Sequence, residues 1–234
     1  MKHYDIILFD ADNTLLDFDA DMDAAFEATY QETGLAAQKP YSREMLQSYY
    51  TINESWWRKF EQGQCTKSEL FTGRFQEYIA RHGFSCDAAW LNDQYFIHLA
   101  KGGRLLPGAM ELVKDLAPRY RMYIVTNGNA TSQKERLLRS GLMDYIADFY
   151  VSEAIGAAKP DIRYFRYVFT QIGETDTAKY ILVGDSLTSD IKGAQNAGID
   201  CIWYNPGALP NTLRKAATYE AENFDSIRKI LLKR

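Results

Sequence analysis

Two aspartates near the N-terminus stand in a pattern that suits chemistry. Asp10 and Asp12 directly follow the apolar run Ile-Ile-Leu-Phe at residues 6–9, whose residue types favour a buried strand. Side chains two positions apart in an extended chain point to the same side, so both carboxylates should project together from the end of that strand. Carboxylates this close repel unless a cation or a shared proton compensates. The pair fits a divalent metal site with a nucleophile and an acid–base group, although alone it also fits a surface turn.

A second apolar run, at residues 120–125, also ends in polar residues. Thr126, Asn127 and Gly128 follow it, and a helical pattern begins at about residue 131. A hydroxyl and an amide between a strand and a helix suit phosphate binding. By itself this is a weak signal, because the same residues make an ordinary turn.

Two further segments place charged residues in comparable positions. Lys159 stands before Pro160, which disfavours helix at the lysine, but a lone lysine is more often a solvated surface charge. The apolar run at 179–183 leads to Asp185, and Asp190 is expected to start a helix. Aspartate also favours helix N-caps, so Asp190 can serve either role or both. The specificity lies in the order of the four segments along the chain.

In that order, the four segments resemble the motifs of the haloacid dehalogenase (HAD) superfamily over the whole chain. The resemblance implies phosphoryl transfer, in which Asp10 is the nucleophile that forms an aspartyl-phosphate. Asp12 would protonate the leaving alcohol and then deprotonate water. It also implies Mg²⁺ as cofactor, held by Asp10, the backbone carbonyl of Asp12 and Asp185. Asp190 would act indirectly, through a water or by orienting the loop. The residues expected to bind the phosphoryl oxygens are Thr126, Lys159 and, assisting them, Asn127.

The elements that must position these residues read as an α/β fold. Strand-like runs alternate with helical stretches in the second half of the chain, which predicts a Rossmann-like parallel sheet with helices on both faces. The expected strands are residues 6–9, 122–126, 149–151, 180–183 and 201–204.

The segment between the first two strands is too long for one crossover. It reads as helices at 21–34, 42–62, 67–82 and 88–100, and the resemblance implies a helical cap inserted after the first motif. The expected domains are a core of residues 1–17 and 103–234 and a cap of residues 18–102. Such a cap would close over the carboxyl ends of the strands, where open α/β sheets bind ligands.

Composition narrows the class of protein. The net charge of −4 and the lack of a basic run argue against a nucleic-acid polymer as partner. The cysteines at 65, 86 and 201 show no disulfide or zinc spacing, which favours a reducing compartment. Neither a signal peptide nor an apolar segment of membrane-spanning length is visible, so no membrane partner and a cytoplasmic location are expected. Nothing in the sequence fixes the oligomeric state.

Other catalytic classes fit poorly. No Gly-x-Ser-x-Gly elbow and no P-loop are present, and the histidines at 3, 82 and 98 are dispersed. Within the superfamily, dehalogenases attack carbon and do without a second motif-one aspartate, so Asp12 favours phosphoryl transfer.

Finer resemblance concerns the substrate, a small-molecule phosphate ester. The string from Asp10 to Phe18, with the Thr-Asn-Gly, Ala-Lys-Pro and Gly-Asp-Ser segments, resembles the pyrimidine 5′-nucleotidase branch, which clears nucleoside monophosphates including non-standard pyrimidines. Asn13 differs from the Gly-Thr-Leu string common in phosphoglycolate and sugar-phosphate phosphatases. Those phosphatases, or a sugar phosphomutase, stay open as alternatives that use the same residues.

Aromatic residues of the expected cap are candidates for contact with a base. Phe18 lies where the cap begins and is the residue expected to bind substrate by stacking. Tyr49, Trp56 and Phe60 recur at helical spacing, which favours packing in the cap's own core. Two aromatics adjacent to that stripe, Tyr50 and Trp57, are left open.

Overall fold

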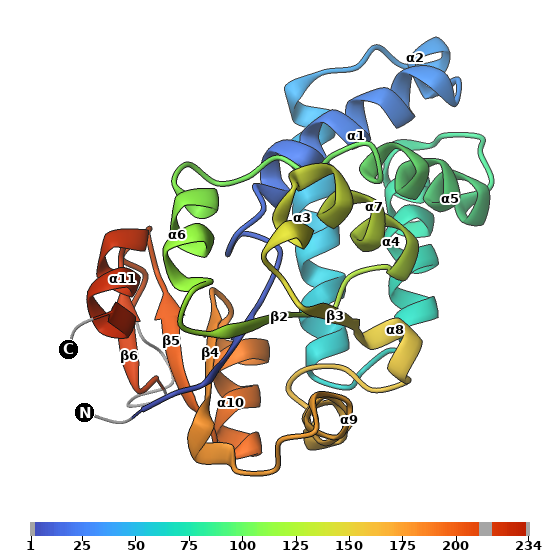
Figure 1. Cartoon of the computed structure of the whole chain (residues 1–234). Helices are drawn as coiled ribbons and strands as arrows, with labels where there is room; N and C mark the ends of the chain where they lie inside the picture. Colours follow the sequence, from blue (N-terminus) through green and yellow to red (C-terminus); the bar gives the residue numbers. More distant parts are fainter. Residues whose placement is uncertain (1–2, 211–216, 233–234) are drawn as a thin grey trace.

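The computed structural model describes residues 3–210 and 217–232, and its centre is a parallel six-stranded sheet (Figure 1). The strand order is β3-β2-β1-β4-β5-β6, which places β1 between β2 and β4. The strands are β1 Ile6–Phe9, β2 Arg121–Thr126, β3 Asp148–Val151, β4 Tyr180–Gly184, β5 Asp200–Tyr204 and β6 Tyr219–Ala221. The predicted fold class is confirmed, and each of the five predicted strands lies within one residue of its expected bounds.

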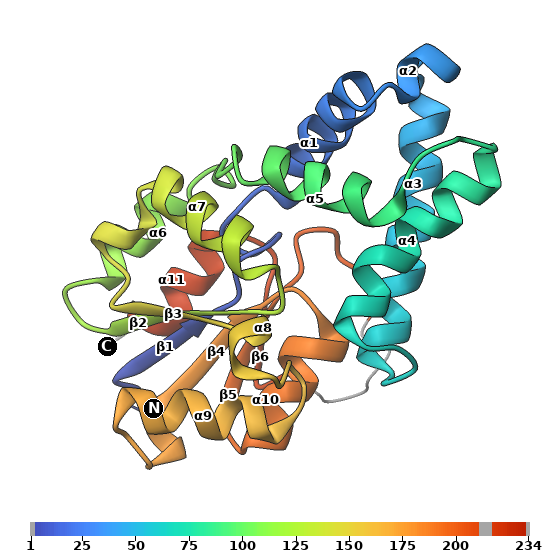
Figure 2. The same cartoon turned by 90° about the vertical axis from the view of Figure 1, so that its right-hand side faces the viewer.

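Helices cover both faces of the sheet because side chains alternate between the faces along each strand. Ile7 and Phe9 belong to one apolar cluster, and Ile6 and Leu8 belong to the other. Figure 2 shows the two helical layers on opposite sides of the strands. The first cluster includes residues of α6 (Ala109–Leu116), α7 (Ala130–Ser140) and α11 (Phe224–Leu232). The second includes residues of α9 (Ile162–Ile172) and α10 (Lys192–Ala197), while the short helix α8 (Ser152–Ile155) follows β3.

Between β1 and α6, the chain forms a separate group of helices with its own apolar cluster, seen to the right and top in Figure 2. These helices are α1 Phe18–Glu32, α2 Leu35–Gln38, α3 Arg43–Glu61, α4 Lys67–His82 and α5 Ala88–Leu99. Local signals define them well: Thr66 and Glu69 form a capping box before α4, and Gly83 ends it with a φ of 66°. The exact domain boundaries, 17/18 and 102/103, stay a prediction.

The predicted aromatic stripe of α3 is correct in part. Tyr49 is fully buried in the helical cluster, where its ring stacks on Phe26 at 4.3 Å between centroids, and Trp56 packs against the same cluster. Phe60 lies outside the cluster and meets the ring of Trp57 edge-on at 5.9 Å. The stripe therefore leaves the apolar cluster toward the end of α3. None of the described helices combines the length and apolar composition that a bilayer span needs.

Candidate active site

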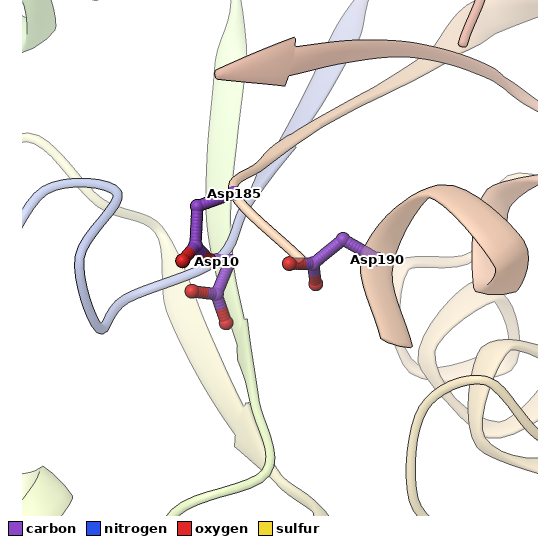
Figure 3. Close-up of side chains that lie close together, drawn as sticks. All are labelled: Asp10, Asp185 and Asp190. Carbon is purple, nitrogen blue, oxygen red and sulfur yellow. The ribbon is translucent and has the colours of Figure 1, made fainter. Parts of the chain in front are cut away.

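Three carboxylates meet at the carboxyl edge of the sheet. Asp10 follows β1 and Asp185 follows β4, and these strands pair directly, with Phe9 opposite Val183. The backbone N–H of Asp10 donates to the Val183 carbonyl at 2.8 Å, so the pairing extends to the catalytic candidate itself. One oxygen each from Asp10, Asp185 and Asp190 lies within 4.8 Å of the others (Figure 3).

Asp190 reaches this cluster from a turn, and its expected place was wrong. It lies inside a π-helical turn, η3 (Leu187–Ile191), whose N-cap is Ser186, and α10 begins only at Lys192. The Asp190 Oδ2 accepts from the Ser186 N–H at 3.1 Å, which fixes the turn. Gly184 makes room for it, because a Cβ on that residue would lie 2.4 Å from the Asp190 Cγ.

Lys159 binds two of the three carboxylates. Its buried Nζ donates to Asp10 Oδ1 and Asp190 Oδ1, both at 2.6 Å, and to the Val125 carbonyl at 2.8 Å. These contacts occupy all three ammonium hydrogens. Burial disfavours the charged amine, but the two carboxylates outweigh this and raise the pKa of Lys159. The lysine is therefore a fixed positive charge beside the nucleophile candidate.

The cluster crowds three carboxyl groups around one ammonium group. Burial raises the pKa of Asp10 to about 7, with Asp190 and Asp12 adding to the shift and Lys159 opposing it. Burial, together with Asp10 and Asp190, raises the pKa of Asp185 well above its ordinary range. A nearby cation would relieve this mutual destabilisation of the carboxylates, and carboxylate oxygens are ligands that Mg²⁺ prefers, so the residues fit that ion.

Asp12 is held by residues of α7 that sequence reasoning missed. Its Oδ1 accepts from Arg136 Nη1 at 2.5 Å, and its Oδ2 accepts from Gln133 Nε2 at 2.9 Å. Arg136 is fully buried, and its Nε donates to Asp21 of α1 at 3.1 Å. The available signal was two long polar residues, three apart, on the inward face of a helix after the second motif.

The predicted phosphate-binding residues come together, and all three contact protein groups, Lys159 through the bonds described above. Thr126 Oγ1 accepts from Gln133 Nε2 at 2.7 Å and from the Gly128 N–H at 3.1 Å. The Asn127 amide pairs with the backbone of Lys159, donating to its carbonyl at 2.9 Å and accepting from its N–H at 3.0 Å. Asn127 thus holds the Lys159 segment in place.

A cavity of about 470 Å³ lies between this cluster and the helical group. All the predicted site residues line it: Asp10, Asp12, Phe18, Thr126, Asn127, Lys159, Asp185 and Asp190. The aromatics left open by the sequence, Tyr50 and Trp57, line it as well. Within the described part of the lining there is no histidine.

The chain is similar in sequence and in structure to several known proteins. The family model of haloacid dehalogenase-like hydrolases matches residues 4–198. YfnB of Bacillus subtilis, named as a HAD-hydrolase, is 38% identical over 99% of this chain and 97% of its own length. The pyrimidine 5′-nucleotidases PynA of Streptococcus pneumoniae and YjjG of Escherichia coli are 37% and 31% identical, covering 96% and 98% of this chain and 93% and 99% of their own. A crystal structure of YfnB bound to magnesium superposes with a TM-score of 0.92, covering 98% of this chain and 99% of that one.

Proposed function

The chain belongs to the haloacid dehalogenase-like hydrolases, as its motifs predicted, and from this premise we propose that it hydrolyses pyrimidine nucleoside monophosphates to nucleoside and phosphate. The observation that carries the proposal is the cluster of Asp10, Asp185, Asp190 and Lys159 at one end of a cavity, with Asp12 beside it. Two full-length relatives are named as pyrimidine 5′-nucleotidases, which supports the substrate class.

The reaction requires that the negative charge of a phosphate ester be neutralised. Mg²⁺ would supply the positive charge that neutralises it, and Asp10, Asp185 and the backbone carbonyl of Asp12 would hold the ion. Asp190 would act indirectly, since its two oxygens already accept from Lys159 and Ser186. The magnesium bound in the YfnB structure supports this choice of ion.

The side chains then divide the work. Asp10 would attack phosphorus to form an aspartyl-phosphate, while the bond to the leaving oxygen breaks. Asp12 would give its proton to that oxygen and later take one from the water that hydrolyses the intermediate. Lys159 orients the Asp10 carboxylate through its 2.6 Å contact, and Thr126, which lines the same cavity, would contact the phosphoryl group.

Phosphate release across a panel of esters tests the substrate class. The panel holds UMP, dUMP, dTMP, purine monophosphates, phosphoglycolate and sugar phosphates, each with magnesium and with EDTA. Release led by the pyrimidine monophosphates, and abolished by EDTA, is expected. Release led by phosphoglycolate or a sugar phosphate would keep the chemistry and reject the nucleotidase assignment. Conversion of a sugar phosphate without free phosphate would indicate a mutase.

Asp10→Asn tests the nucleophile. An amide cannot form the acyl phosphate, so turnover of the best substrate should fall by about a thousandfold or more while circular dichroism stays unchanged. Asp144→Asn, which removes an exposed carboxylate away from the cavity, is the matched control and should retain activity. Retained turnover in Asp10→Asn would refute the assignment.

A further inference from the structure

A positive charge is buried in the helical group. Arg74 of α4 is 2% exposed, and within the described residues it forms no salt bridge. Its guanidinium donates to two neutral amides: Nη1 donates to Asn53 Oδ1 at 2.7 Å and Nη2 donates to Asn92 Oδ1 at 3.1 Å. Burying an unpaired charge is costly, so its retention here calls for a reason.

Aromatic rings surround this guanidinium without using its hydrogens. Its central carbon lies 4.9 to 5.4 Å from the ring centroids of Phe71, Phe75, Tyr95 and Phe96. Ring faces attract a cation, but they do not replace oxygen acceptors in the guanidinium plane. Within the described residues, the Nε of Arg74 has no hydrogen-bond partner. At least one N–H of this guanidinium is therefore unmatched.

Arg74 lines the same cavity as Asp10, on the wall that the helical group supplies. Asn53 also lines it, with its Oδ1 taken by Arg74 and its Nδ2 only 3.7 Å from the Met22 sulfur, a weak acceptor. Phe18, Tyr50 and Trp57 form an aromatic wall of the same cavity, whose lining also includes the acidic residues Asp19, Glu54 and Glu61. One cavity thus brings together the carboxylate cluster, flat aromatic rings and surplus N–H groups.

We propose that Arg74 and Asn53 form a subsite that binds a carbonyl oxygen of the pyrimidine base. The inference rests on the proposed function and specifies how the leaving nucleoside is recognised. A flat heterocycle fits the aromatic wall, and every pyrimidine nucleobase carries a carbonyl at C2, which accepts from a donor-only group such as guanidinium. A sugar phosphate has hydroxyl groups in place of the flat ring and its carbonyl, so it lacks the surface that would stack on the aromatic rings.

A purely structural role for Arg74 predicts a different result. In that case the residue only ties α3 to α5 through Asn53 and Asn92. Its removal would then lower stability and reduce the turnover of all esters alike. A subsite instead makes the loss depend on the presence of the base.

The deciding quantity is the ratio of kcat/KM for UMP to kcat/KM for ribose 5-phosphate, which has the same ester but no base. We expect the magnesium-loaded wild type to favour UMP and Arg74→Met to lower the ratio at least tenfold, mainly through the KM for UMP. Arg74→Lys should restore part of it. An unchanged ratio with parallel losses on both esters would overturn the subsite. A wild type that hydrolyses UMP without favouring it over ribose 5-phosphate would do the same.

The two asparagines give a matched pair if the arginine variants fold poorly. Asn53 lines the cavity, whereas Asn92 contacts Arg74 from outside it. Asn53→Ala should lower the ratio at least fivefold, and Asn92→Ala should lower the melting temperature without changing the ratio. Equal ratios in both variants would overturn the proposal. Failure of the wild type on every nucleotide in the panel would instead refute the proposed function, so the two failures are distinguishable.

Discussion

At the residue scale, Arg136 links the acid–base candidate to the helical group. Its guanidinium lies between two carboxylates, Asp12 at 2.5 Å and Asp21 at 3.1 Å, and its Nη2 has no partner within the described residues. A fixed cation beside Asp12 stabilises the carboxylate that remains after proton donation. Arg136 is thus a positioning residue whose effect should depend on how much the leaving group needs a proton.

Arg136→Met should reduce kcat for UMP by about a hundredfold, because Asp12 loses its orientation and its counter-charge. An ester with a good leaving group, p-nitrophenyl phosphate, needs little protonation and should lose about tenfold less. Steady-state kinetics on both esters measures the difference. Arg139→Met, an exposed change on the same helix, is the control. Equal losses on the two esters would show that Arg136 serves only the fold.

Sequence reasoning found the residues of the motifs but not the residues that orient them. Asp10, Asp12 and Asp185 follow apolar strands, and that signal is local. Arg136 meets Asp12 from 124 positions away, a contact that only the folded chain creates. Asn13 is an intermediate case: its φ of 57° is one that asparagine tolerates, and its side chain accepts from the Phe18 N–H at the start of α1. The sequence showed that Asn13 stands where related phosphatases have glycine. The positive φ at this position explains why asparagine is suited to it.

At the element scale, the helices were predictable because their ends carry local signals. Thr66, Glu69 and Gly83 bound α4 at its expected residues. The strand β6 was missed, since it has three residues and depends on pairing with β5 for its extended conformation. The turn η3 was also missed, because the Asp190 side chain that fixes it forms its bond only beside Ser186 in the folded loop.

His98 of α5 contacts α1 in a way that should make the stability of the protein depend on pH. Its Nε2 lies 3.3 Å from Glu32 Oε2 of α1, and its Nδ1 lies 3.1 Å from the Lys101 Nζ. A neutral ring that accepts at Nδ1 satisfies both contacts, whereas a second ring proton would meet the ammonium. Burial and then Lys101 lower the pKa of His98 below its ordinary value of 6.5, against the opposing effect of Glu32.

The sign of the stability change follows from this shift. Between the lowered pKa and 6.5 the unfolded chain binds the proton more strongly, so stability is fully present above 6.5 and is lost as pH falls. Urea unfolding at about pH 7.5 and about pH 5.5 should show that His98→Gln loses less free energy of unfolding than the wild type. His3→Gln changes a histidine whose side chain is 88% exposed and should leave the wild-type difference intact. If His98→Gln keeps that difference, another group causes it.

At the scale of the whole molecule, a few polar contacts join the helical group to the sheet. Lys67 Nζ donates to the Gly128 carbonyl at 2.8 Å and to Ser152 Oγ at 2.6 Å, and the Thr188 hydroxyl donates to Glu61 at 2.6 Å. These residues are far apart in sequence, so no local pattern predicts them. Glu61 and Gly128 also line the cavity, and a crystal structure of YfnB bound to magnesium reveals interdomain movement. We infer that these contacts favour the arrangement of the helical group and the sheet described here.

Lys67→Met removes two of these contacts while keeping the length of the side chain. If the arrangement described here is the one that binds substrate, a smaller population of it raises the apparent dissociation constant in proportion, so KM for the best ester should rise about fivefold. Hydrogen exchange should quicken together in the first turn of α4 and in residues 127–129, because the contact protects both partners. Lys59→Met, on α3 with its amine over the Trp56 ring, removes a cation that does not reach the sheet and should change neither quantity. A raised KM without faster exchange would show that Lys67 acts by attracting the charged substrate. It would contradict the inference that its contacts hold the helical group against the sheet.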